Sequence, residues 1–323
     1  MEIDYTFDAM GSDVRLLIGP ALAPGQPTPE AAAQREHEFV LDYGHRLSRF
    51  RADSELCALN RDPRREVPAS PLLRSAVSAG LWSAQRSGGL VEPTLVREIE
   101  AAGYRTSRAG ATPASLAEAL SEAPPRTPAR PNPASRWREV TVSQERGTVS
   151  RPPGVMLDTG GTGKGLCADA VAYRLRGYTR FVVDCGGDIA LGGVGAQLDP
   201  YEIDVAHPVS GAVIGTLSLQ RRGIATSGLN VRIWRIPDGG FAHHLLDPST
   251  GQPAWTGLIS VTAVGESALE AETLSKLALL LGLEGAREVL APLGGVIVRD
   301  DGGWEMVGPL AMRSPRTLSG VRS

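Results

Sequence analysis

Leu157-Asp158-Thr159-Gly160-Gly161-Thr162-Gly163-Lys164-Gly165 is the stretch on which the fold of this chain depends. The apolar residues 154–157 predict a strand that ends here, and the residues after the glycines predict a helix over about 164–176. A glycine-rich turn that opens a helix presents backbone N–H groups, which suit phosphate oxygens. The stretch therefore indicates a phosphate-binding turn, and a purely structural tight turn is the alternative.

Two common phosphate motifs do not explain this stretch. A P-loop needs a glycine five residues before Gly163 and a serine or threonine after the lysine, but Asp158 and Gly165 stand there. The dinucleotide fingerprint matches only through its glycines, and the sequence pattern lacks the strand and helix alternation that should precede it. Neither of these nucleotide-binding folds is therefore predicted.

The rest of the chain predicts an α+β fold. Residues 3–18 read as two strands around a turn at Met10-Gly11-Ser12. The strands mostly follow one another, so regular alternation with helices is not expected. A proline-rich stretch at about 112–136 is predicted to connect an N-terminal lobe to a C-terminal lobe of one domain. Further strands are expected near 140–142, 181–183, 201–205 and 214–217, and helices near 29–47, 70–86, 114–122 and 268–282.

Composition narrows the class of protein. The 323 residues include 42% apolar and 21% charged ones, which is typical of a globular protein. A formal net charge of −3 argues against a general nucleic-acid-binding protein. Three widely spaced cysteines, Cys57, Cys167 and Cys185, indicate neither a disulfide framework nor a zinc site. There is no run of 18 apolar residues and no signal pattern in residues 1–7, so we expect a cytoplasmic protein without a membrane span.

A charged pair on the last helix is the second candidate site. Glu272 and Lys276 are four residues apart and share one face. A surface ion pair would stabilise the chain by only about 0.3–0.5 kcal/mol. The apolar run 277–281 favours a deeply packed helix instead, with the two charges at the mouth of a cleft. Three further segments are individually ordinary turns: Asp184-Cys185-Gly186-Gly187-Asp188, Ala225-Thr226-Ser227-Gly228, and residues 243–251 with His244-Leu245-Leu246-Asp247-Pro248.

Taken in order, these segments resemble the FAD:protein FMN transferase (ApbE) family. Seven ordered elements between about residues 5 and 300 carry the resemblance. They are Phe7-Asp8-Ala9-Met10-Gly11-Ser12; the run from Leu47-Ser48-Arg49-Phe50 to Ser54-Glu55-Leu56 with Asn60; Val91-Glu92-Pro93-Thr94; the Asp158–Gly165 loop with Asp169; Gly186-Gly187-Asp188; Ala225–Gly228; and His244–Gly251.

The resemblance implies a fold, a reaction and a set of site residues. It implies a T-fold-like α+β architecture with two lobes around a flavin-nucleotide cleft. The implied reaction cleaves FAD at its pyrophosphate, passes FMN to a threonine hydroxyl of an acceptor flavoprotein and releases AMP. Glu272 and Lys276 are the implied catalytic residues, and magnesium is implied at the Gly161 carbonyl with Glu272 and Ser275. The residues expected to line the cleft are Met10, Phe50, Leu90, Val91, Glu92, Asp158, Lys164 and Leu246.

The sequence departs from the family pattern at the magnesium positions. The family usually has aspartate at the position of Glu272 and threonine at that of Lys276, and Glu92 also replaces an aspartate. A protonated lysine cannot ligate magnesium, because its ammonium has no lone pair. Its positive charge is expected to face the pyrophosphate instead and to replace part of the metal's role. Two alternatives to a transferase therefore stay open, a non-catalytic flavin-nucleotide-binding protein and a hydrolase that gives FMN and AMP.

Overall fold

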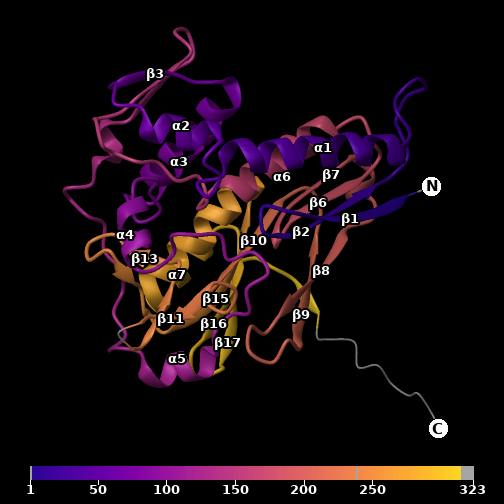
Figure 1. Ribbon diagram of the computed structural model, residues 1–323. Helices are drawn as coiled ribbons and strands as arrows, with labels where there is room; N and C mark the ends of the chain where they lie inside the picture. Colours follow the sequence, from indigo (N-terminus) through magenta and orange to yellow (C-terminus); the bar gives the residue numbers. More distant parts are fainter. Residues whose placement is uncertain (1, 238, 314–323) are drawn as a thin grey trace.

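An eight-stranded sheet forms the centre of the structure, a computed structural model that describes residues 2–237 and 239–313 (Figure 1). All neighbouring strands pair antiparallel, in the order β1-β2-β6-β7-β10-β15-β16-β17. The α+β prediction is confirmed. The strands are β1 (Ile3–Ala9), β2 (Ser12–Ile18), β6 (Phe181–Cys185), β7 (Asp188–Gly192), β10 (Gly223–Gly228), β15 (Leu258–Gly265), β16 (Gly295–Arg299) and β17 (Trp304–Val307).

Two helices cover one face of this sheet next to the glycine-rich stretch. Helix α6 (Gly163–Arg174) packs on β6 and β7, and helix α7 (Ala268–Leu290) packs on β10 and β15. The two helices also pack against each other. Every residue of β15 is buried, because apolar side chains cover this strand on both faces. The predicted helices near 164–176 and 268–282 are therefore confirmed, and α7 continues to Leu290 past a non-helical Gly282.

A small sheet covers the opposite face. Val182, Val264 and Val296 alternate with neighbours that face the helices, and they pack against Leu217 and Leu219. This alternation follows from the period of two in a strand. The second sheet consists of β8 (Tyr201–Ala206), β9 (Val213–Leu219) and β18 (Met312–Arg313).

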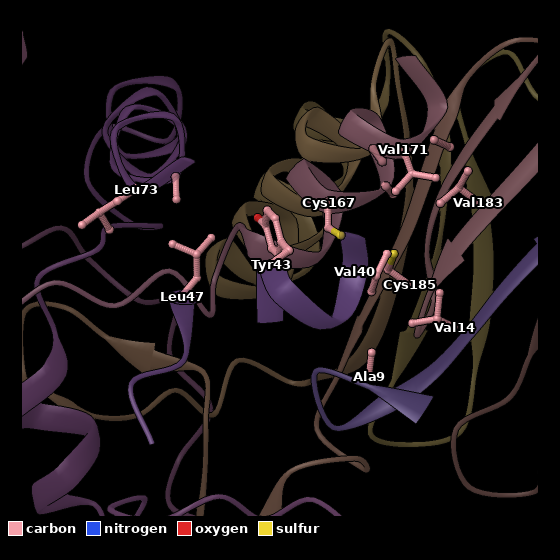
Figure 2. Packing of buried hydrophobic residues seen from close by; sticks show 14 of the residues in the cluster. Ala9, Val14, Val40, Tyr43, Leu47, Leu73, Cys167, Val171, Val183 and Cys185 are labelled. Atoms are coloured by element: carbon pink, nitrogen blue, oxygen red, sulfur yellow. The ribbon is translucent and has the colours of Figure 1, made fainter. Parts of the chain in front are cut away.

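The N-terminal helices stand beside the central sheet. Helix α1 (Pro29–Leu47) follows the cap Thr28, whose side chain accepts from Ala31 N, and it packs on β1 and β2. Figure 2 shows Tyr43 of α1 beside Cys167 of α6 in the same buried cluster. Helix α3 (Pro71–Arg86) has the same cap arrangement at Ser70. Both helices were predicted and are confirmed.

One predicted strand is absent from the structure. Residues 154–157 form no strand, although they are apolar. The side chain of Asn60 takes the place of a neighbouring strand here: its Nδ2 donates to Leu157 O at 2.8 Å, and its Oδ1 accepts from Leu157 N at 2.8 Å. The backbone is thus satisfied by an amide 97 residues away in sequence, which no local pattern predicts.

The proline-rich stretch packs along the surface near the C-terminal half of α7. Thr127 N donates to Trp255 O at 2.9 Å, and Ala129 N donates to Leu280 O at 2.8 Å. The short helix expected here is present as α5 (Leu116–Glu122).

The remaining elements are α2 (Glu55–Arg61), α4 (Val96–Ala101), β3 (Glu66–Pro68), β4 (Thr141–Ser143), β5 (Thr148–Ser150), β11 (Ile233–Arg235), β12 (Phe241–His243), β13 (Leu246–Asp247), β14 (Gln252–Pro253) and the 3-10 helices Arg136–Glu139 and Val194–Gln197.

Candidate functional site

A cleft of about 730 Å³ lies between the β1–β2 turn, the end of α1, the glycine-rich loop and α7. Its size is that of a typical small-molecule or cofactor site. Glu272 and Ser275, in contrast, are fully buried and do not line the cleft. The predicted residues that do line it are Met10, Phe50, Leu90, Val91, Glu92, Asp158, Gly161, Lys164, Leu246 and Lys276.

Met10 enters the cleft from a two-residue hairpin turn. Ala9 pairs with Ser12, so Met10 and Gly11 form the turn with φ angles of 52° and 71°. Positive φ at both positions matches the twist of a tight hairpin. Among the described residues, Met10 is the only non-glycine residue with a positive φ. A Cβ at Gly44 of α1 would lie 3.0 Å from Met10 Cγ, so a glycine here leaves room for the methionine.

Aromatic rings and one arginine form the wall beside Asp158. The Arg49 guanidinium lies 4.1 Å from the Phe50 ring centroid and 4.7 Å from that of Tyr104. Its Nε is 3.0 Å from Asp158 Oδ2, and Asp158 Oδ1 accepts from Gly160 N at 2.8 Å. Asp158 therefore holds both the arginine and the start of the glycine-rich loop. This wall offers flat surfaces on which a planar ring can stack.

Glu92 lies on the apolar side of the cleft with Leu90 and Val91. Burial raises the pKa of its carboxyl group, although the Thr94 hydroxyl donates to it and opposes this shift. The carboxyl group of Glu92 therefore takes up a proton at a higher pH than an exposed glutamate does.

The lysine of the glycine-rich loop is paired with a buried carboxylate. Lys164 Nζ lies 2.6 Å from Asp188 Oδ2 and donates to Gly186 O at 3.2 Å. Burial opposes the charge of this lysine, but Asp188 and Glu272 outweigh it and raise its pKa to about 12. Lys164 therefore stays charged where it faces the cleft.

The second lysine of the cleft, Lys276 of α7, is also paired with a buried carboxylate. Lys276 Nζ donates to Glu272 Oε1 at 2.9 Å, and Glu272 Oε2 accepts from Gly165 N at 2.9 Å. Burial and the charge of Asp188 raise the pKa of Glu272 to about 7, against the opposing effect of the two lysines. Lys276 lines the cleft, whereas Glu272 is fully buried and contacts the cleft only through Lys276.

The predicted magnesium ligands do not fit a metal ion. Both carboxylate oxygens of Glu272 already accept hydrogen bonds, one of them from an ammonium group. Ser275 Oγ donates to Glu272 O at 3.1 Å and lies 2.8 Å from Ser227 Oγ, so it is also engaged. Gly161 alone of the three lines the cleft. Within the described residues no three His, Cys, Asp or Glu side chains cluster as metal ligands.

His244 lies in the cleft near both lysines. Its Nδ1 is 3.4 Å from Arg232 O, and because a carbonyl only accepts, this nitrogen carries the proton. Nε2 is then an acceptor. Burial and the charges of His243, Lys276 and Lys164 lower the pKa of His244 to about 3, so the ring is neutral.

Several site residues were missed by the sequence analysis as functional candidates. Arg49, Asp188, Ser227 and His244 all stood in motifs that the sequence displayed, but no local pattern distinguishes their side chains from turn residues. Tyr104 lies outside every motif, and only the fold brings it to Arg49.

Comparison with known proteins agrees with this architecture. The chain is 32% identical to the FAD:protein FMN transferase of Salmonella typhimurium over 43% of this chain, which spans only 40% of that protein. It is 29% identical to the one of Treponema pallidum over 84% of this chain and 77% of that protein. The structure resembles the ApbE protein of Thermotoga maritima with a TM-score of 0.74 and 25% identity, covering 95% and 97% of the two chains. The ApbE family model matches residues 10–298, so the chain belongs to the ApbE family.

Proposed function

We propose that this chain is a FAD:protein FMN transferase, which moves FMN from FAD to an acceptor protein. One observation carries the proposal: a single cleft joins two charged lysines at one end to an aromatic and apolar wall. The lysines suit a pyrophosphate, and the wall suits a planar ring system. Relatives over most of the chain have the same activity by name.

In the proposed reaction the acceptor is a threonine hydroxyl. Its oxygen forms a bond to the phosphorus that carries FMN, while the P–O bond to AMP breaks and AMP leaves with the electron pair. The hydroxyl proton goes to His244 Nε2, the free acceptor of the ring. Bound pyrophosphate offsets the charge of the two lysines, which raises the pKa of His244 and makes it a stronger base.

The experiment mixes the chain with FAD and a purified acceptor domain that a relative modifies. AMP is measured by chromatography, and protein-bound flavin is measured by in-gel fluorescence. We expect both products in equal amounts, and no bound flavin with a Thr→Val acceptor. AMP without bound flavin would indicate a hydrolase, and FAD binding without AMP would indicate a binding protein.

His244→Asn separates the proposed base from a binding role. The asparagine retains a polar group in the cleft but cannot take up the proton. We expect FAD affinity to stay within about twofold while AMP release falls about 10²–10⁴-fold, as for other general bases. An unchanged rate of AMP release would rule out His244 as the base.

In the described part of the chain, no helix is long and apolar enough to cross a membrane.

A further inference from the structure

The chain contains only two lysines, Lys164 and Lys276, among its 33 basic residues. The other 31 are arginines, so the chain uses arginine at every basic position outside this site. Both lysines line the same cleft, and each is paired with a buried carboxylate. This coincidence indicates a requirement that an ammonium group meets better than a guanidinium group does.

The chemistry of an ammonium explains that requirement. Arginine presents a wide planar fork, whereas lysine is a compact point charge with three donors. Within the described residues, Lys276 Nζ uses one donor on Glu272, which leaves two for a ligand. Lys164 Nζ uses two, on Asp188 and Gly186 O, and keeps one. Together they present three N–H groups and two positive charges to the cleft.

Lys276 stands where the family usually has threonine, and its ammonium group occupies the carboxylate of Glu272 that a metal would need. It sits one helical turn from Glu272, and its side chain is 12% exposed, so it is held beside the carboxylate. A divalent cation would have to displace an ammonium that the same helix keeps in place. A charge fixed by a buried partner needs no reorganisation when an anionic ligand arrives.

We propose that Lys276, held by Glu272, is the phosphate-binding cation of this cleft, and that it binds the pyrophosphate of a flavin nucleotide together with Lys164 and without a divalent metal. This inference rests on the proposed function, because it assumes a flavin nucleotide as ligand. Lys276 would touch the phosphate, and Glu272 is a positioning residue. No metal then enters the binding step.

The first test measures binding of FAD and of riboflavin by fluorescence quenching, each in EDTA and in millimolar magnesium. We expect the wild-type chain to bind FAD in EDTA and magnesium to change the affinity by less than about twofold. Lys276→Met should weaken FAD binding about tenfold or more in EDTA, the loss of one charged hydrogen bond, and leave riboflavin binding unchanged. Lys276→Arg should recover part of the loss.

A matched control removes a positive charge from the same helix outside the cleft. Arg287 of α7 pairs with Glu284 and Glu305, so Arg287→Met should leave FAD affinity within about twofold. If Lys276→Met does not fold, Glu272→Gln combined with Lys276→Gln replaces the ion pair by a neutral hydrogen-bonded pair and is measured instead. Equal FAD affinity of the wild type and these Lys276 variants in EDTA, or a tenfold gain with magnesium in the wild type, would overturn the proposal.

The second test needs no variant, because amine-directed reductive methylation can modify only these two side chains besides the amino terminus. Mass spectrometry of the wild-type chain in EDTA should show that FAD protects Lys276 and that riboflavin does not. Labelling of Lys276 that FAD leaves unchanged contradicts the proposal. A chain that binds neither FAD nor riboflavin overturns the flavin transferase proposal itself, which distinguishes the two failures.

Discussion

Asp169 and Glu272 cap each other's helices. Asp169 of α6 accepts from Ala268 N at 2.8 Å and from Leu269 N at 2.9 Å, at the first turn of α7. Glu272 of α7 accepts from Gly165 N at 2.9 Å, in the first turn of α6. Each carboxylate satisfies N–H groups that a helix start leaves without a partner. The two helices are thereby fixed in register, and with them the glycine-rich loop and Lys276.

Asp169→Ala is expected to destabilise this helix pair. The substitution leaves two partly buried N–H groups of α7 without their side-chain acceptor, so the free energy of unfolding should fall by about 1–3 kcal/mol. Urea denaturation measures this change in the free energy of unfolding. Asp42→Ala, which removes the exposed partner of Arg46 on α1, should change stability by less than about 0.5 kcal/mol. Equal losses for the two variants would contradict the capping role.

Gly165 permits the close approach of α6 and α7. A Cβ here would lie 2.6 Å from Ala268 O and 2.9 Å from Glu272 Oε2. Gly165→Ala should therefore lower the free energy of unfolding by about 1–3 kcal/mol, the usual effect of overpacking, and weaken FAD binding. Gly163→Ala is the control for stability alone, because its Cβ meets nothing closer than 3.8 Å although Gly163 lines the cleft. Denaturation followed by circular dichroism measures the stability of both variants, and FAD titration measures the affinity of Gly165→Ala. Equal stability of the two variants would rule out this role of Gly165.

Local patterns predicted the hairpin and the helices α1, α3, α5, α6 and α7, but not the short helices α2 and α4. Thr28 and Ser267 cap two of these helices, since each side chain accepts a hydrogen bond from the backbone N–H three residues later. The turn at Met10-Gly11 follows from residues next to each other in the chain. Ten of the residues named from the family resemblance line one cleft, and their roles there stay predictions.

Relationships between distant residues could not be predicted. The bonds of Asn60 to Leu157 replace the strand expected at 154–157, and they depend on contacts that only the folded chain creates. The sequence shows that Glu272 and Lys276 share a helix face, but not that Glu272 turns inward to Gly165 while Lys276 reaches the cleft. The orientation follows from the packing of α7 against α6.

The buried His243 makes the fold sensitive to acid. Burial lowers its pKa from 6.5 to about 3, so between these values the unfolded chain binds a proton that the folded chain does not. The free energy of unfolding therefore falls as pH decreases through this window, by up to about 1.4 kcal/mol per pH unit for this group. His243→Phe, which keeps a ring beside Trp255, should reduce that slope.

Urea denaturation at several pH values between 3 and 7 measures the effect of His243→Phe. His207→Gln is the control, since His207 lies in the turn before β9, away from the cleft. It should keep the pH dependence of the wild type. A His243→Phe slope equal to that of the wild type would show that another group causes the loss of stability in acid.

Two aspartates in family motifs should have separable roles. Asp158 pairs with Arg49, which lies over two aromatic rings of the cleft, so Asp158→Asn leaves that guanidinium without its charged partner. We expect FAD affinity to fall about tenfold.

Asp247 instead accepts from Arg130 N at 3.1 Å and from Ser249 N at 2.9 Å, which holds the proline-rich stretch to a turn. Asp247→Ala should lower the free energy of unfolding by about 1 kcal/mol and leave FAD affinity within twofold. FAD titration and urea denaturation of both variants test the contrast, and wild-type affinity in Asp158→Asn would remove this aspartate from the binding site.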